Sequence, residues 1–198
     1  VAGLLATLGV IAIACLVALA SERNMVGLWR AGGLAFFGIT IAAVLAMRGT
    51  TFEGVLAGIV LGCAVWFTDT AAFFTGRQIG GERLAPDISP SKTWSGALGG
   101  LAFGTVAGTI AWLFIAPASP WWVGAILAGL LSVAGQLGDL AESAIKRRFR
   151  VKDSGDIIPG HGGLMDRLDS LTFAVLLLSA IGLTRGGIDG VAAGFLSW

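Results

Sequence analysis

Long apolar runs, separated by short charged segments, dominate the pattern along the chain. Residues 1–20 contain no charged side chain, and neither do residues 93–138. A helix of about 20 apolar residues crosses a hydrocarbon core of about 30 Å. The longest run is divided at Pro117–Pro120, so the pattern predicts six membrane-spanning helices. They lie at 1–20, 31–47, 55–74, the two halves of 93–138, and 168–184.

The two ends of the chain refine this prediction. Residues 191–198 are apolar but too short to span a bilayer. Residues 1–20 lack the basic start and small-residue cleavage site of a signal peptide. Because Val1 already lies within an apolar run, we expect further sequence to precede it in the full-length protein. The expected fold is an all-α integral membrane protein, a polytopic bundle of about six transmembrane helices forming one membrane-embedded domain over residues 1–198.

The composition supports a membrane protein. Of the 198 residues, 56% are hydrophobic and 13% are charged, whereas soluble domains are about 25% charged. The mean hydropathy of +0.86 also excludes a disordered chain. Cys15 and Cys63 each lie inside an apolar run, so no disulfide framework is expected.

Positive charge is distributed unevenly between the connecting segments. Every second connecting segment lies on the same side of the predicted bundle. The segments on one side are 21–30, 75–95 and 146–165, and they hold ten of the 13 Lys and Arg residues. The opposite segments hold only Arg48 and Arg185. By the positive-inside rule the richer side is cytoplasmic. We therefore expect a multi-pass protein of a bacterial-type inner (plasma) membrane, with its active site facing the cytoplasm and both ends of the sequence outside.

Glycine recurs at every fourth position in two of the apolar runs. These ridges are Gly54, Gly58 and Gly62, and Gly96, Gly100, Gly104 and Gly108. Small residues at this spacing let helices approach closely inside a bilayer. A pore lining or a dimer face would use the same spacing, but we expect packing within the bundle.

Three carboxylates interrupt the apolar runs, at an insertion cost of about 2.5–3.5 kcal/mol each. Glu142 can form an ion pair with Lys146, one helical turn later. Asp139 has no basic residue within one turn, and Asp69 lies near the end of its run, so both are candidates for chemistry. One helical face carries a polar set that consists of Gln136, Asp139, Ser143 and Lys146.

The densest polar region follows this face. Five cations occur within residues 146–152, a glycine loop follows at 159–163, and Asp166 and Asp169 begin the next apolar run. The cations alone would anchor the helix and attract anionic headgroups, and Asp169 could simply complement a helix dipole. Carboxylates facing a basic cluster at a membrane surface nevertheless suit a phosphate-bearing substrate with a divalent metal.

A second polar loop, residues 76–96, lies on the same predicted side. It lacks the Gly-Lys-Ser/Thr ending of a Walker A motif. Ser89 and Pro90 are expected to start the fourth span, as its cap and first turn. Lys92 and the neighbouring hydroxyls could reach a nucleotide.

These motifs resemble the signature of phosphatidate cytidylyltransferases (CDP-diacylglycerol synthases). The long signature reads Ser143-x-x-Lys146-Arg147, Lys152-Asp153, Pro159-Gly160-His161-Gly162-Gly163 and Asp166-Arg167-x-Asp169. Upstream are Asp69-Thr-Ala-Ala-Phe-Phe-x-Gly76-Arg77 and Ile88-Ser89-Pro90-x-Lys92-Thr93-Trp94-x-Gly96. The matches cover residues 69–169, about half of the chain. Family members usually carry more spans at the amino terminus, so the resemblance implies that residues 1–198 lack N-terminal helices of the full-length member. Phe73 also departs from the pattern, which often has tyrosine there.

The resemblance implies that phosphatidate and CTP give CDP-diacylglycerol and pyrophosphate, with Mg²⁺. It implies that Asp139 and Asp166 bind the metal, together with a second, monovalent cation such as K⁺, and that Lys146 and Arg147 join them in catalysis. The residues expected to bind substrate are Asp69, Ser89, Lys92, Thr93, Ser143, Lys152, Asp153, His161, Arg167 and Asp169. The expected partners are the lipid bilayer and a second copy of the chain in a homodimer, with no nucleic acid.

The chemistry of this reaction limits the role of His161. A phosphate monoester with a second pKa of about 6 is already largely dianionic near neutrality. The nucleophile needs charge neutralisation more than deprotonation, so we expect His161 to donate a hydrogen bond to phosphate or to organise the glycine loop.

Two other functions fit parts of the sequence. A CTP-dependent enzyme acting on another membrane lipid, an isoprenoid or polyprenol, would need similar motifs. A transporter would also place polar residues in a glycine-rich bundle, but it leaves unexplained why most charges gather at one surface.

Overall fold

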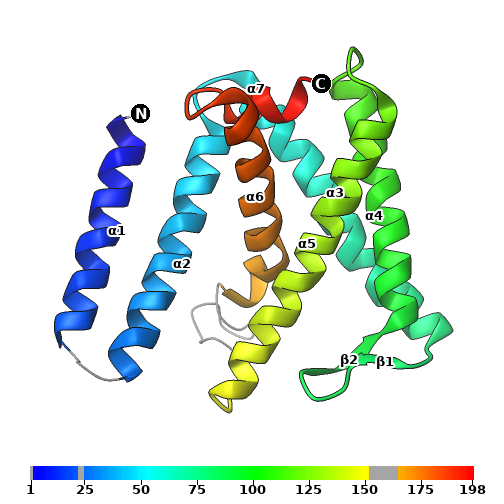
Figure 1. Cartoon of the computed structure of the whole chain (residues 1–198). Coiled ribbons are helices and arrows are strands. Elements are labelled where there is room, and N and C mark those ends of the chain that lie inside the picture. The colour runs from blue at the N-terminus through cyan, green and yellow to red at the C-terminus, as the bar shows by residue number, and fades with distance from the viewer. Residues whose placement is uncertain (1, 22–24, 152–164) are drawn as a thin grey trace.

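The computed structural model describes residues 2–21, 25–151 and 165–198, without the side chains of Ala2, Leu4, Leu5, Asp166 and Arg167. This part of the chain forms seven helices and one two-stranded hairpin (Figure 1). In chain order they are α1 (Ala2–Ser21), α2 (Met25–Arg48), α3 (Phe52–Ile79), β1 (Arg83–Ala85), β2 (Ser89–Thr93), α4 (Trp94–Ile115), α5 (Trp121–Arg148), α6 (Met165–Gly186) and α7 (Val191–Leu196).

The six long helices follow the six predicted apolar runs in order, which confirms the all-α polytopic fold. Among the described residues, five helices, α2 to α6, are long and apolar enough to cross a membrane. In α1 the stretch Ala6–Ser21 is apolar but shorter than these spans. The six-residue α7 agrees with the prediction that the C-terminal segment is too short to span.

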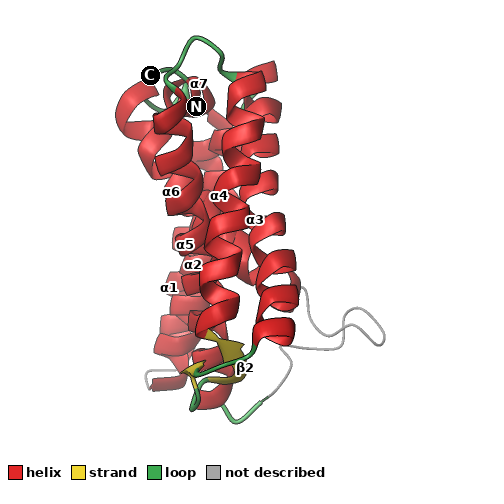
Figure 2. Cartoon of the chain, turned by 90° about the vertical axis from the view of Figure 1, so that its right-hand side faces the viewer, coloured by secondary structure: helices red, strands yellow, loops and turns green. Residues whose placement is uncertain are grey.

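The long helices lie side by side along one axis (Figure 2). The hairpin, the end of α5 and the start of α6 lie at one end of the bundle, and both ends of the chain lie at the other (Figure 1). We call the first of these the hairpin end. The rings of Trp29 and Phe149, 5.1 Å apart between centroids, join the start of α2 to the residue after α5 there. The described parts of segments 21–30, 75–95 and 146–165 therefore lie at one end of the bundle, as the charge pattern predicts.

Helix α3 forms the centre of the bundle, because it packs against α2, α4, α5, α6 and α7. Its buried Val60 and Val65 share one apolar core with Leu131 of α5, Leu178 of α6 and Phe195 of α7. Helix α1 lies at the edge and packs on α2 (Figure 1).

The outer surface of the bundle is apolar. Side chains such as Trp66, Phe114 and Trp121 are each more than half exposed. Exposed apolar area on this scale is unfavourable in water and marks a surface covered by another apolar phase. The protein is therefore a membrane protein by its surface as well as by its helix lengths.

Glycine packing brings α3 and α4 close together. A Cβ atom at Gly100 would lie 2.9 Å from the carbonyl oxygen of Thr68, and one at Gly104 would lie 2.8 Å from that of Ala64. The packing role predicted for the α4 ridge is confirmed. The prediction is wrong for Gly58 of the α3 ridge, where a Cβ would meet no atom within 4 Å. Regular spacing defines a face of a helix, but not whether a neighbouring helix covers it.

The hairpin turns the chain between α3 and α4. Helix α3 ends at Ile79 because Gly80 and Gly81 adopt φ values of +65° and +103°, which favour glycine. The strands β1 and β2 then pair antiparallel, with Arg83 opposite Thr93.

The predicted start of α4 at Ser89 and Pro90 is wrong, because both residues belong to β2. Thr93 is the cap instead: its hydroxyl accepts a hydrogen bond from the backbone N–H of Gly96 at 3.1 Å. Pairing with β1 extends the backbone up to Thr93, so a Ser-Pro pair that would suit a helix start ends up in a strand.

Candidate active site

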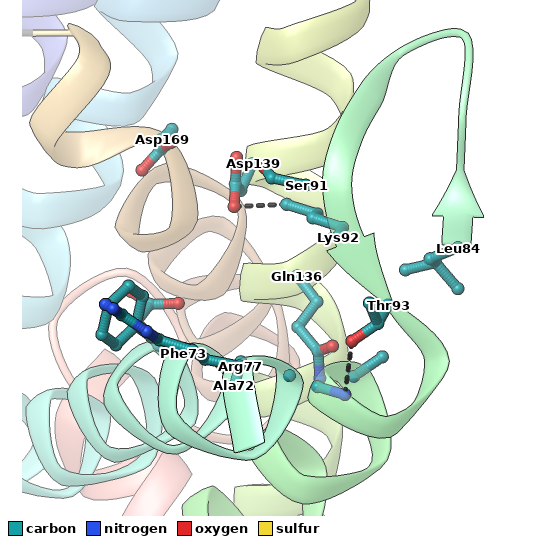
Figure 3. Close-up of a pocket in the computed structure, with 14 residues that line it drawn as sticks. Ala72, Phe73, Arg77, Leu84, Ser91, Lys92, Thr93, Gln136, Asp139 and Asp169 are labelled. Atoms are coloured by element: carbon teal, nitrogen blue, oxygen red, sulfur yellow. Dashed lines mark hydrogen bonds and ion pairs between the residues drawn. The ribbon is translucent and has the colours of Figure 1, made fainter. Parts of the chain in front are cut away.

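A cavity of about 640 Å³ opens at the hairpin end, within the usual size of small-molecule sites. Its walls come from α3, both strands of the hairpin, α4, α5 and the start of α6 (Figure 3). The charged and amide-bearing side chains that line it are Asp69, Arg77, Lys92, Gln136, Asp139 and Asp169. Elements from most of the chain therefore bring charged and amide-bearing side chains to one cavity in an apolar bundle.

One face of α3 forms a wall of the cavity. Asp69, Phe73 and Arg77 follow one another at intervals of one helical turn and all line it. Gly76 lies on the same face, where a Cβ would be 3.4 Å from the Cα of Gly96. The close approach of α3 and α4 thus continues to the cavity and positions this face against the start of α4.

Lys92 and Asp139 form an ion pair across the cavity, between β2 and α5 (Figure 3). Their side chains are 24% and 33% exposed. The sequence indicates no basic partner for Asp139 because none lies within a turn of α5. The hairpin brings that partner from a distant segment.

Asp69 and Asp169 meet at the junction of α3 and α6. The hydroxyl of Ser170 donates to Asp69 Oδ2 at 2.8 Å, and the Ser170 backbone N–H donates to Asp169 Oδ1 at 2.7 Å. Asp139 acts electrostatically on both aspartates, as does Lys92. The cavity therefore holds three carboxylates and one ammonium group, and that ammonium group pairs with Asp139.

The end of α5 carries two further cations with protein partners. Lys146 Nζ lies 3.4 Å from Glu142 Oε1, and Glu142 is only 3% exposed. This confirms the ion pair that the sequence suggests for Glu142. Arg147 Nε donates to the carbonyl of Ile88 at 3.2 Å and so ties α5 to the turn of the hairpin. Neither cation lines the cavity.

The predicted site residues therefore divide into three groups. Those that line the cavity are Asp69, Lys92, Thr93, Asp139 and Asp169. Those described outside its lining are Ser89, Ser143, Lys146 and Arg147. Those that lie outside the described residues are Lys152, Asp153 and His161, together with the side chains of Asp166 and Arg167.

The structure adds Phe73, Arg77 and Gln136 to the candidate site. Their spacing carries the signal that finds them. Phe73 and Arg77 lie one and two turns after Asp69, and Gln136 lies one turn before Asp139. Residues one or two turns from an intramembrane carboxylate share its face, so Asp69 and Asp139 indicate which neighbours can line the cavity.

The donor set suits a hard divalent cation. Carboxylate oxygens are the protein ligands that Mg²⁺ prefers, usually one or two of them with substrate phosphates completing the shell. Asp139 and Asp169 line the cavity, and Asp166 precedes Asp169 by one turn in α6. Within the described residues no three His, Cys, Asp or Glu side chains are placed to hold an ion together. The carboxylates of the cavity therefore supply the type of ligand that Mg²⁺ prefers.

Comparisons with known proteins cover almost the whole chain. Residues 2–184 match a family model described as the cytidylyltransferase family. The chain is 41% identical over 196 residues to a phosphatidate cytidylyltransferase of Brucella suis, which covers 99% of this chain and 72% of that relative. It is 46% identical over 124 residues to the phosphatidate cytidylyltransferase of Bacillus subtilis, covering 62% of this chain and 46% of that relative.

Proposed function

The chain belongs to the cytidylyltransferase family, and we propose that it transfers the cytidylyl group of CTP to phosphatidate, forming CDP-diacylglycerol and pyrophosphate. One observation carries the proposal. The motif residues Asp69, Lys92 and Asp139 come from three distant segments and line one cavity, in a chain that matches such an enzyme over 99% of its length.

The reaction exchanges one phosphoanhydride bond for another. A phosphate oxygen of phosphatidate attacks the α-phosphorus of CTP, and the bond from that phosphorus to the oxygen bridging to the β-phosphate breaks. The electron pair leaves with pyrophosphate. Because the lipid phosphate is largely dianionic near neutrality, the nucleophile needs no strong base. The protein must instead bring two anions together and stabilise the leaving group.

The cationic residues of the cavity suit that task. Lys92 and Arg77 both line it and offer N–H donors to phosphate oxygens. Lys146 and Arg147 lie at the adjacent end of α5, where the lipid phosphate would approach from the membrane surface. We assign His161 to hydrogen bonding with phosphate or to organising its glycine loop.

We further assign Mg²⁺ to Asp139 and Asp166, with a monovalent ion such as K⁺ as a second cation. The donor chemistry of the cavity supports this assignment. A bound Mg²⁺ would neutralise phosphate charge and stabilise departing pyrophosphate. Asp69, fixed by the Ser170 hydroxyl, would orient groups at the edge of the same site.

We propose that the hairpin end faces the cytoplasm, where CTP is found. The support is the clustering of Lys and Arg in the segments at this end. We also propose a homodimer as the working assembly. Measuring the mass of the protein in detergent would test that state.

The function is tested by pyrophosphate release from purified protein. We expect release from CTP to require both phosphatidate and Mg²⁺, with CDP-diacylglycerol appearing in equal amount. A panel of polyprenol and isoprenoid lipids, assayed in the same detergent, serves as the comparison. Release with a member of this panel but not with phosphatidate would contradict the assigned substrate.

A further inference from the structure

Lys92 occupies a position that the proposed metal site would also need. Its ammonium group pairs with Oδ2 of Asp139, the carboxylate to which we assign Mg²⁺. Both side chains are partly exposed and line the cavity, so a ligand there could reach either partner. One cation is thus already placed at the carboxylate before any other is added.

The surroundings of Lys92 give this ammonium group a defined electrostatic role. It acts on Asp69 and on Asp169 as well as on Asp139. Like charges gathered in a partly buried cavity repel one another, and a cation among them relieves the repulsion. Lys92 therefore offsets the charge of Asp139 directly, through their ion pair, and that of Asp69 and Asp169 more weakly.

We infer that Lys92 exchanges partners, neutralising Asp139 before substrates bind and moving to the phosphates of CTP when a divalent cation takes its place. The exchange rests on the proposed function, because it presupposes the CTP and metal sites assigned above. Lys92 then contacts the substrate itself and, through its exchange with Asp139, couples the binding of cation and nucleotide.

The local structure lets this exchange occur in the side chain alone. The backbone around Lys92 is held within β2, because Ser89 pairs with Ala85 before it and Thr93 pairs with Arg83 after it. Thr93 also caps α4. A lysine carries a compact ammonium on a flexible four-carbon stem with three donors. It can therefore rotate from a carboxylate to a phosphate on the same cavity wall without moving the hairpin.

The exchange has a thermodynamic consequence. A divalent cation that binds alone must displace Lys92 from Asp139, which weakens its binding. Triphosphate offers Lys92 a new partner, which removes this penalty. Coupling of this kind is reciprocal, so the cation strengthens nucleotide binding by the same factor.

The direct test measures cation affinity without nucleotide. Mn²⁺ serves as the probe, and its binding to the purified full chain in detergent is followed by electron paramagnetic resonance. Lys92→Met removes the ammonium and keeps the apolar stem. Arg77→Met is the matched control, since it removes a positive charge from the same cavity and leaves the Lys92–Asp139 pair intact.

We expect Lys92→Met to bind Mn²⁺ at least about fivefold more tightly than the wild type, at the lower end of typical coupling. Arg77→Met should show a smaller gain, and Lys92→Arg should bind Mn²⁺ as weakly as the wild type. In an Asp139→Asn background, Lys92→Met should produce no further gain. If Lys92→Met binds Mn²⁺ no more tightly than Arg77→Met does, the exchange is overturned.

A second measurement follows the lysine itself. The rate at which Lys92 is acetylated by a small reagent, read by mass spectrometry, should rise when Mn²⁺ is added and fall again with CTP. Lys146 is the internal reference, because its Glu142 partner lies outside the cavity lining. A Lys92 rate unchanged at saturating Mn²⁺ would overturn the exchange.

The two proposals fail in distinguishable ways. The affinity and acetylation results could be as expected while the wild-type protein forms no CDP-diacylglycerol. That outcome would support the exchange at a metal site and contradict the proposed reaction. An active enzyme without the Mn²⁺ effects would keep the reaction and overturn the exchange.

Discussion

The hydroxyl of Ser170 donates a hydrogen bond to Asp69 across 101 positions of sequence, at 2.8 Å. The backbone N–H of the same residue donates to Asp169 at 2.7 Å. Ser170 is buried, at 6% exposed, whereas the Asp69 carboxylate that accepts its hydrogen bond is exposed. One residue at the start of α6 thereby orients two carboxylates of the cavity and joins α6 to α3.

Ser170→Ala should therefore impair the reaction. A hydrogen bond to a charged group contributes about 1.5–3 kcal/mol, and a loss of 1.4 kcal/mol of transition-state stabilisation corresponds to about tenfold in rate. We expect kcat/KM for CTP to fall about tenfold or more. Ser179→Ala is the control, because Ser179 is also buried in α6 but donates to the carbonyl of Ala43, away from the cavity. It should lower thermal stability and leave kcat/KM near the wild-type value. An unchanged kcat/KM in Ser170→Ala would show that Asp69 needs no such orientation.

Asp139→Asn and Asp166→Asn should each abolish nearly all turnover. Both keep the size of the side chain and remove one charge, so the protein should still fold and insert. The effects should be strongly non-additive, because loss of either ligand disables one shared site. Steady-state rates across a Mg²⁺ titration are the measurement. Asp87→Asn, an exposed change in the hairpin turn, should retain activity. Near wild-type rates with unchanged Mg²⁺ dependence in both single variants would refute the metal assignment.

His161→Asn should retain measurable activity, whereas Lys146→Ala and Arg147→Ala should lose much more. A phosphate dianion requires neutralisation by cations rather than deprotonation by a base. Rates measured from acidic to basic pH provide the test. If His161→Asn bound substrates normally, lost all activity and lacked the acidic limb of a bell-shaped profile, histidine would be the general base.

Cysteine placed at Ser91 should react with an impermeant thiol reagent only from the cytoplasmic side. Ser91 is exposed in β2 at the hairpin end. Ser154→Cys, outside the described residues, should behave in the same way. Thr50→Cys, exposed between α2 and α3 at the opposite end, should react only from outside. Labelling of Ser91→Cys from outside in sealed right-side-out vesicles would reverse the proposed orientation.

Gly104→Ala should destabilise the bundle, while Gly58→Ala should not. A Cβ at Gly104 would press against the Thr68 hydroxyl and the carbonyl of Ala64. At Gly58 the space is open, and alanine favours a helix by about 1 kcal/mol over glycine. The melting temperature in detergent should fall for Gly104→Ala and stay level or rise for Gly58→Ala. A fall of equal size in both would mean that the α3 ridge is also packed.

The sequence alone determined the long helices and identified the carboxylates that are candidates for chemistry. Runs of about 20 apolar residues cross a bilayer as helices, because a helix forms the hydrogen bonds of every backbone N–H and C=O group within its own segment. Carboxylates in such runs are costly, so Asp69 and Asp139 stood out before any contact was known. The signature around Lys146 and Asp166 then indicated the family that the comparisons support.

Only the tertiary structure decided which of these residues meet. The partner of Asp139 is Lys92, from another element, and the partner of Asp69 is Ser170, from a third. The spacing of residues in the sequence indicates neither pair, because contacts between elements depend on how the elements pack against each other. Tertiary packing also decides that no neighbour covers Gly58 and that Ser89 lies in a strand. Local patterns define faces and termini, whereas the neighbours that cover a face are set by the whole bundle.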